Sequence, residues 1–176
     1  MSARVLIAVG IGSSLVYLHL CPTTKFLLFI NGWAESTQLN QLTTRFYEHV
    51  AKDALLSPVF ANMSADHPSH VAAFLAEVLG GPATYSKHHG GHPHMIQHHL
   101  NRHLTHDMRW RWVALLLETA DAARMPDDPE FRSALVGYLE WGSRLAVINS
   151  QPGAKADPHA PMPKWGWGEV KGPYEA

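Results

Sequence analysis

The sequence predicts an all-α domain, and three observations support this prediction. Beyond residue 30, apolar residues recur at the spacing of three to four that marks one face of a helix. No stretch shows the sustained alternation of apolar and polar residues that is typical of a half-buried strand. Gly and Pro gather between the periodic segments, where they end helices. A chain of 176 residues can bury such a core without disulfides or a structural metal.

The first two predicted helices cover residues 36–55 and 69–81. In the first, Ser36 is the expected N-cap, and Pro58 ends or bends the element. Its apolar face comprises Leu39, Leu42, Phe46, Val50 and Leu55. The face of the second comprises Val71, Phe74, Leu75 and Val78. A Gly-Gly-Pro stop follows the second helix, and a short loop then leads into a histidine-rich tract.

Two longer helices are predicted in the second half of the chain. One covers residues 105–124, and the Thr105 hydroxyl can cap its N-terminus. Its inward residues are expected to be Val113, Leu116, Leu117 and Ala120. After the turn "MPDDPE", a final helix covers residues 130–150.

The two ends of the chain differ from this helical body, which is assigned to residues 27–150. Residues 1–26 contain a mostly apolar run of signal-peptide length, which is short for a spanning helix of about 20 residues. Membrane anchoring, export and a non-native extension all remain open for it. Residues 151–176 are rich in Pro, Gly and Trp and show no helical period. Trp165 and Trp167 indicate that this tail lies against the body.

Charge and cysteine content exclude several classes of function. The formal net charge of −1 gives no basis for a nucleic-acid partner or a polybasic membrane surface. Cys21 is the single cysteine, which excludes an intramolecular disulfide framework. Nothing in the composition requires an oxidising compartment, so we expect a cytoplasmic protein.

The histidines are unevenly distributed. Eight of the thirteen fall between His88 and His106. Histidine is the commonest metal ligand, and the spacings in "HHGGH" and "HPH" could hold Zn²⁺ or Ni²⁺ directly. No carboxylate or cysteine is placed to complete a closed tetrahedral site, however. Composition alone leaves open a metal-binding tract, a run of surface imidazoles, or one functional histidine among them.

Helix geometry separates these histidines. A Gly-Gly-x-Pro start signal predicts a short helix over residues 93–100. Its only apolar side chains, which spread over one side at about 100° per residue, are Met95, Ile96 and Leu100.

His99 falls within this apolar arc, whereas His98 stacks over His94 on the opposite face. His99 therefore points into the protein, either as a hydrogen-bonded core histidine or as a metal ligand. His103 would share the inward side if the helix continued, so it is a competing choice. Helix geometry by itself does not decide between the core and ligand roles.

A wider pattern bears on this choice. The segments "RFYEHVAKDALLSPVF", "FLAEVLGGPATYSKHHGGHPHMIQHH" and "RWRWVALLLETADAARMPDDPEFRSALVGYLEWGSRLAVINSQPGA" occur in this order. Together they resemble the group II truncated haemoglobins over about residues 28–154. The most specific features are the Gly-Gly-Pro-x-x-Tyr stop, the Gly-His segment before the haem histidine and the Arg-Trp-Val that follows. The resemblance implies a two-over-two helical sandwich around haem b.

Carried over to this chain, the resemblance implies that His99 is the proximal ligand of the haem iron, which agrees with the helix geometry. Met95 would flank it and contact the haem. Phe60 matches the aromatic that packs on the haem edge, although ordinary core packing would look the same. Tyr47 falls where the family places a distal hydroxyl; the alternative is a core ring with its hydroxyl at the surface. Because Phe46 and Tyr47 are adjacent, they are not expected to face the same way.

The resemblance also places residues on the distal side of the haem. Trp112 matches the distal tryptophan, although Trp110 also reaches the apolar face by the helical wheel. His67 and Val71, four residues apart, are expected to face the gas ligand from the second helix. His70 remains a rival to His67, because the length of the preceding loop is uncertain.

The activity implied by the resemblance is the binding of O2, NO, CO and similar diatomic ligands. Hydroxyl and indole donors, here Tyr47 and Trp112, would stabilise a ligand that carries partial negative charge, each by about 1.5–3 kcal/mol. Such a site favours NO dioxygenase or peroxidase-like chemistry, with an unidentified reductase as electron donor. A homodimer is left open. The alternative function is direct binding of transition metals by exposed histidines for storage or sensing. A haem-based sensor is less favoured, because the sequence shows no output domain.

Overall fold

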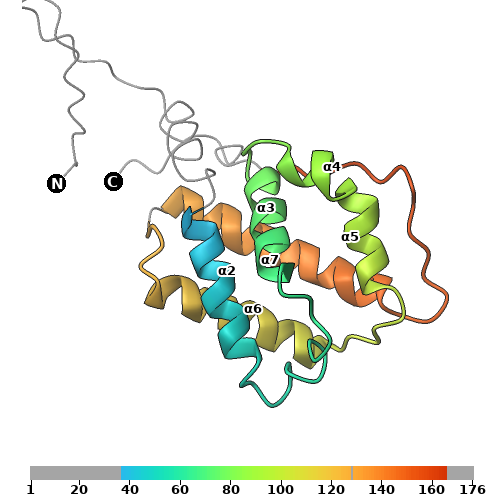
Figure 1. Cartoon of the computed structure of the whole chain (residues 1–176), viewed down its shortest axis with the longest axis horizontal. Coiled ribbons are helices and arrows are strands. Elements are labelled where there is room, and N and C mark those ends of the chain that lie inside the picture. Colours follow the sequence, from blue (N-terminus) through green and yellow to red (C-terminus); the bar gives the residue numbers. More distant parts are fainter. Residues whose placement is uncertain (1–36, 128, 166–176) are drawn as a thin grey trace, which may run out of the picture.

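The computed structural model describes residues 37–127 and 129–165, and this part of the chain contains helices and no strand. The helices are α2 (Thr37–Val50), α3 (His67–Val78), α4 (Thr84–His88), α5 (Gly91–His99), α6 (His106–Ala122) and α7 (Pro129–Asn149). Figure 1 shows their arrangement. The prediction of an all-α domain is confirmed. The predicted cap Ser36 and residues 1–26 lie outside the described residues.

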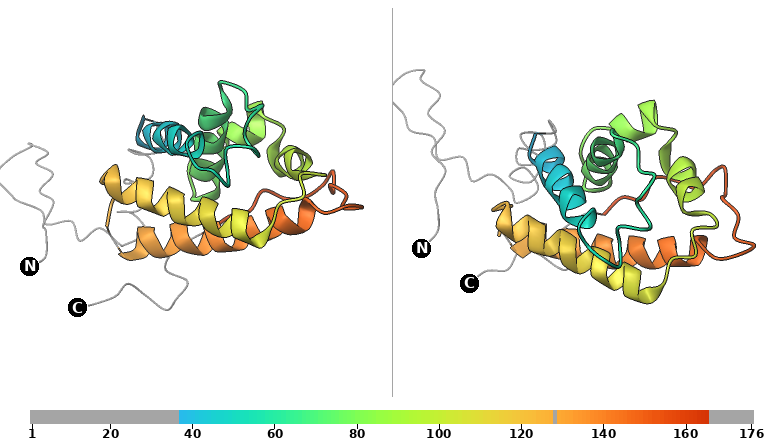
Figure 2. Two further views of the ribbon diagram at one scale, coloured as in Figure 1. Left: turned by 90° about the horizontal axis from the view of Figure 1, so that it is seen from below. Right: turned by 60° about the horizontal axis from the view of Figure 1, so that its bottom comes forward.

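The helices form two layers. α6 and α7 run side by side as one layer, and α2 and α3 pack on each other in the second layer (Figure 2). α2 also packs directly on α6. The short helices α4 and α5 follow α3, and α5 packs against α7. This is the two-over-two arrangement that the resemblance implies.

Apolar faces of four helices meet in one core. The fully buried side chains at its centre include Leu42 and Phe46 of α2, Leu116 of α6, and Leu135 of α7. Removing this apolar surface from water stabilises the fold by roughly 25 cal/mol per Å². Leu42, Phe46 and Leu116 belong to the predicted apolar faces, because helical spacing determines which side chains lie on the buried side.

The first helix is shorter than predicted, and the assignment of Leu55 to its apolar face is wrong. α2 ends at Val50, and the Asp53 carboxylate then accepts hydrogen bonds from the backbone amides of Leu55 and Leu56 at 3.0 and 3.1 Å. An Asp side chain that bonds the backbone in this way stabilises a turn in place of a helix. The helical phase is therefore lost, so Leu55 is 39% exposed and Leu56 is buried.

The segment before the histidine tract contains a helix that the sequence did not predict. α4 covers Thr84–His88, which is too short to produce a readable helical period. Gly90 and Gly91 then take φ angles of 75° and 66°, which glycine adopts without a side-chain clash. α5 starts at Gly91, two residues before the predicted start, with Pro93 in its first turn.

The predicted N-cap of α6 is confirmed, since the Thr105 hydroxyl accepts a hydrogen bond from the Met108 amide at 3.2 Å. The tail also lies against the body as predicted, because the Trp165 ring packs 5.7 Å from that of Trp141. Trp167 lies outside the described residues. Within residues 37–127 and 129–165, no helix is long and apolar enough to cross a membrane.

Candidate functional site

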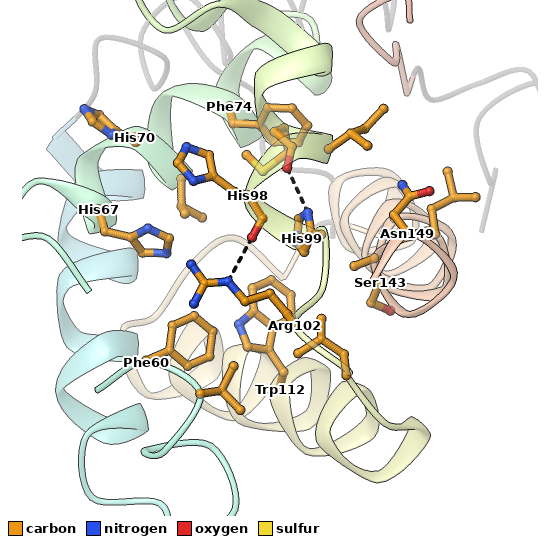
Figure 3. A pocket seen from close by; sticks show the side chains of 18 of the residues that line it. Phe60, His67, His70, Phe74, His98, His99, Arg102, Trp112, Ser143 and Asn149 are labelled. Carbon is orange, nitrogen blue, oxygen red and sulfur yellow. Dashed lines mark hydrogen bonds between the residues drawn. The ribbon is translucent and has the colours of Figure 1, made fainter. Parts of the chain in front are cut away.

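A cavity of about 450 Å³ lies between α3 and α5 and extends to α6 and α7 (Figure 3). Its surface is mostly apolar, with a few polar side chains that come from different helices. Ligand sites commonly combine apolar walls with a small number of placed polar groups. Nearly all the site residues expected from the sequence contribute to its lining, namely Tyr47, Phe60, His67, Val71, Met95, His99 and Trp112.

One wall of the cavity is α5, which carries His99. The His99 Nδ1–H donates to the Met95 carbonyl one turn earlier, at 2.9 Å. Burial lowers the pKa of His99, so the ring is neutral near pH 7. Because a carbonyl only accepts, the proton is on Nδ1 and the Nε2 lone pair is available. Nε2 has no hydrogen-bond partner in the part of the chain that the structure describes.

The neighbouring histidines are placed differently. His98 is exposed and packs edge-on against His94, with ring centroids 4.4 Å apart, as the helix geometry predicted. Both also line the cavity, however, so the prediction that only His99 of the adjacent pair faces it is wrong (Figure 3). α5 ends at His99, so His103 does not continue it. His103 lies in the following turn at φ 52°, exposed and outside the cavity lining. The competing choice of His103 is therefore wrong for this cavity.

Tyr47 and His67 form a hydrogen-bonded pair on the opposite wall. The Tyr47 hydroxyl lies 2.9 Å from His67 Nε2, and only 4% of Tyr47 is exposed. The alternative that this hydroxyl reaches the surface is therefore wrong. Burial raises the pKa of Tyr47, which keeps the phenol protonated, and the nearby Trp112 side chain acts weakly in the opposite direction.

Phe46 is also buried, so both adjacent aromatics are covered by the fold. Its ring packs edge-on against Trp112 at 5.3 Å and against Tyr47 at 4.8 Å. Adjacent helical residues are about 100° apart, so both can be covered where neighbouring helices pack on two sides. α3 and α6 both pack against α2 in this way.

The structure separates the two tryptophans of α6. Trp112 lines the cavity, whereas Trp110 is 63% exposed and does not contribute to it. Trp112 therefore presents the only indole that α6 brings to the cavity lining. The helical wheel could not make this distinction, because both tryptophans can reach the broad apolar face of the helix.

The structure also separates His67 from His70. His67 contacts Tyr47, and burial together with the positive potential of other histidines lowers the pKa of His67 to about 4. His70 lines the cavity as well, but its Nε2 lies 3.3 Å from Asp66 and its ring packs 4.2 Å from that of His89. Of these two histidines, His67 is therefore the one that pairs with the Tyr47 hydroxyl.

Several polar cavity residues were not anticipated, among them Arg102, Ser143 and Asn149. Arg102 lies just beyond α5 and donates from Nε to the His98 carbonyl at 3.2 Å. Ser143 and Asn149 come from α7 (Figure 3). A charged residue three positions after His99 was a usable signal for Arg102. Ser143 and Asn149 carry no local signal, because only the packing of α7 brings them to the cavity.

The donor set fits an iron porphyrin better than a bare metal ion. A bare ion needs several converging ligands, and no group of three or more His, Cys, Asp or Glu in residues 37–127 and 129–165 is arranged to hold one. A porphyrin needs one neutral imidazole from the protein and apolar walls for its rings. His99 and the mostly apolar cavity supply both.

A two-layer helical body around such a cavity defines a globin-type haem protein, the class whose members bind diatomic gases at the haem. Sequence comparison agrees with this class. The profile of the bacterial-like globin family matches residues 32–140, and the chain belongs to this family.

The chain is also similar to the group 2 truncated hemoglobin YjbI of Bacillus subtilis (strain 168). The two are 33% identical over 113 residues, which covers 64% of this chain and 83% of the relative. No solved structure matches the chain. The predicted membership of the group II truncated globins is thereby confirmed, and the family gives the chain its cofactor class, haem, and its ligand class, diatomic gases.

Proposed function

We propose that the chain binds haem b in this cavity, where His99 Nε2 would ligate the iron, and that the chain binds O2, NO or CO. The observation that best supports this proposal is the position of His99. It is partly buried, its Nδ1 donates to the Met95 carbonyl, and its Nε2 is free in a cavity whose far wall holds a hydroxyl, an imidazole and an indole. The globin domain is placed at residues 27–150 in this proposal.

Apolar side chains would hold the rings of the cofactor. Phe60, Val71 and Met95 line the cavity and are partly buried against the core. The carboxylates of the cofactor require a cationic or hydrogen-bonding partner where they meet protein. Arg102 is suited to this role, because its guanidinium lines the same cavity and lies on the same segment as His99.

The bound haem supplies a coordination position for a diatomic ligand and one-electron chemistry at its iron. The protein supplies hydrogen-bond donors on the far wall. The Trp112 indole N–H only donates, whereas the Tyr47 hydroxyl both donates and accepts. A donor to a partly charged acceptor is worth about 1.5–3 kcal/mol, so these groups would slow escape of a polar ligand such as O2.

The protonation of His67 determines what Tyr47 can do. With its pKa at about 4, His67 is neutral near pH 7 and carries one ring proton. If this proton is on Nε2, it is donated to the Tyr47 oxygen, and the hydroxyl proton is free for the gas ligand. If it is on Nδ1, the Tyr47 hydroxyl proton is donated to His67 instead. The His67 tautomer thus controls one of the two donors.

A site that retains O2 in this way suits its reaction with NO better than rapid O2 delivery. The overall change is NO + O2 + e⁻ → NO₃⁻, and we propose that an unidentified reductase supplies the electron. Peroxidase-like chemistry would draw on the same polar wall, but no residue pair in the described chain favours it over the reaction with NO.

The activity is tested by mixing the oxygenated protein with NO in a stopped-flow instrument and measuring nitrate. We expect one nitrate per protein in the first turnover, and repeated turnover only with a reductant. Ligand exchange without nitrate would contradict the dioxygenase activity. That outcome would leave the assignment of His99 untouched, because the absorption spectrum tests it separately.

A further inference from the structure

The segment 151–165 forms a loop of chain that begins and ends on the helical body. It leaves the end of α7, passes around α5 and returns to α3 (Figure 1). We call residues 151–165 the strap. The family match ends at residue 140, so the strap lies beyond the matched residues.

The strap starts where the end of α7 holds the turn after α5. The backbone amide of His103 donates to the Ser150 carbonyl at 3.0 Å, and the Leu104 amide donates to the Ser150 hydroxyl at 2.9 Å. The Gln151 side-chain amide donates to the Leu104 carbonyl at 3.0 Å. These bonds fix the C-terminal side of α5, next to His99.

The middle of the strap contacts the other end of α5. The His92 Nδ1–H donates to the Pro161 carbonyl at 2.9 Å. Met162, the next residue, packs against the core. α5 is therefore held at its N-terminal turn by the strap, and the loop that follows α5 is held by the residues from which the strap departs.

Trp165 anchors the far end of the strap. Its backbone amide donates to the Val78 carbonyl at the end of α3, at 2.8 Å. Its ring packs against Tyr138 and Trp141 of α7, at 6.1 and 5.7 Å between centroids, and both of these residues line the cavity. The ring also fills the space above Gly137, where an added Cβ would lie 3.0 Å from the Trp165 Nε1.

α5 needs this support more than the longer helices do. It has nine residues, and its main helix neighbours are α4, itself only five residues long, and α7. Short helices are marginal without tertiary contacts. Ile96 is its only buried side chain of any size. Two left-handed glycines precede its second residue, so its N-terminal turn is joined to α4 by a permissive link.

We propose that the strap, anchored by Trp165 and joined to α5 through His92, is a positioning element for the His99 wall of the cavity. It holds α5 against α7 and so sets how firmly the cofactor is retained. The claim about retention rests on the proposed function, whereas the claim about α5 does not.

The experiment compares two strap variants of the full chain with a matched control. Trp165→Ala removes the anchor. Gly137→Leu displaces the same ring without altering the strap sequence, and it places a good helix former in α7. Trp110→Ala is the control, because it also removes a tryptophan but from an exposed position outside the cavity and the strap.

Amide hydrogen exchange of the haem-free chain should rise roughly tenfold or more in α5 of both strap variants, with α2 and the control unchanged. In the haem-loaded chain, haem transfer to excess apomyoglobin should accelerate by a similar factor, with a shifted iron–histidine stretching band in the Raman spectrum. Unchanged α5 exchange, or an equal rise in α2 and α5, would overturn the proposal. A chain that takes up no haem would contradict the proposed function instead, and α5 exchange would still decide on the strap.

Discussion

The two walls of the cavity differ in how their functional side chains are held. On one wall, His99 stands on a nine-residue helix whose other imidazoles, His92, His94 and His98, also line the cavity, the last two from exposed positions. On the other, Tyr47, His67 and Trp112 come from three different helices and share one network of ring contacts. Within this network the Tyr47 ring lies 4.8 Å from that of Phe46, which in turn lies 5.3 Å from that of Trp112.

This difference separates two requirements of the site. The His99 wall needs only the Nε2 lone pair of one imidazole at one position. The Met95 carbonyl, one turn earlier, is sufficient to orient that ring. The opposite wall needs donors of defined direction, and these are fixed only when each ring is packed on the next. Changes on the two walls should therefore affect different quantities, namely cofactor retention on one and gas-ligand dissociation on the other.

The largest effect on gas-ligand dissociation is expected from Trp112→Phe. The change keeps a ring against Phe46 but removes a group that can only donate. Loss of about 1.5–3 kcal/mol would raise the O2 dissociation rate by roughly tenfold to 150-fold. Flash photolysis or stopped-flow displacement of O2 by CO measures this rate.

Trp110→Phe is the matched control, since Trp110 is exposed and does not line the cavity. It should leave the O2 dissociation rate unchanged. Equal rates in the two variants would show that Trp112 is a packing residue and not a donor.

A second effect concerns acid stability of the haem-free chain. The pKa of His67 falls from 6.5 to about 4 on folding, so the unfolded chain takes up a proton over this window while the folded chain does not. The free energy of unfolding should therefore decrease as pH falls from 6.5 to 4, with a His67 contribution on the order of 1–2 kcal/mol after allowing for partial exposure. At pH 7 this contribution is fully present.

Urea unfolding of the wild type and of His67→Gln at pH 7 and pH 4.5 isolates this contribution. The variant should lose less stability on acidification than the wild type. If the two lose the same amount, His67 is solvated in the folded chain and does not form the buried pair with Tyr47.

The smallest effect is expected from Tyr47→Phe. Its hydroxyl proton is shared between His67 and the gas ligand, so only part of a hydrogen bond is lost, about 0.5–1.5 kcal/mol. The O2 dissociation rate should rise roughly twofold to tenfold. A larger increase than in Trp112→Phe would show that the hydroxyl, not the indole, is the dominant donor.

The sequence predicted the His99 wall better than the opposite wall, for a physical reason. Helical spacing correctly placed His99 at the cavity and His98 beside His94, although His98 also lines the cavity. Whether Trp110 or Trp112 meets the cavity depends on the packing of α6 against α2, which no local pattern contains. The same holds for Ser143 and Asn149 of α7.

The error at the end of the first helix had a local cause, whereas the Tyr47–His67 pair depends on the fold. The exchange of Leu55 for Leu56 came from one Asp53 side chain that ends the helical phase after α2. The resemblance placed Tyr47 in the family pattern, but its bond to His67 joins residues that are twenty positions apart. Only the folded chain brings these two side chains together.

The most direct measurement of the central claim is the absorption spectrum of purified chains loaded with haem. The two variants to compare are His99→Ala and His98→Ala, which remove adjacent imidazoles of α5 that both line the cavity. Of the two, His99 is the one whose Nδ1 is held by the Met95 carbonyl one turn earlier. We expect the wild type and His98→Ala to share the same Soret band. In His99→Ala, the band should be lost or shifted to that of weakly held haem, and added imidazole should restore it. An unchanged spectrum in His99→Ala, or loss of the band in His98→Ala, would contradict the assignment of His99 as the iron ligand.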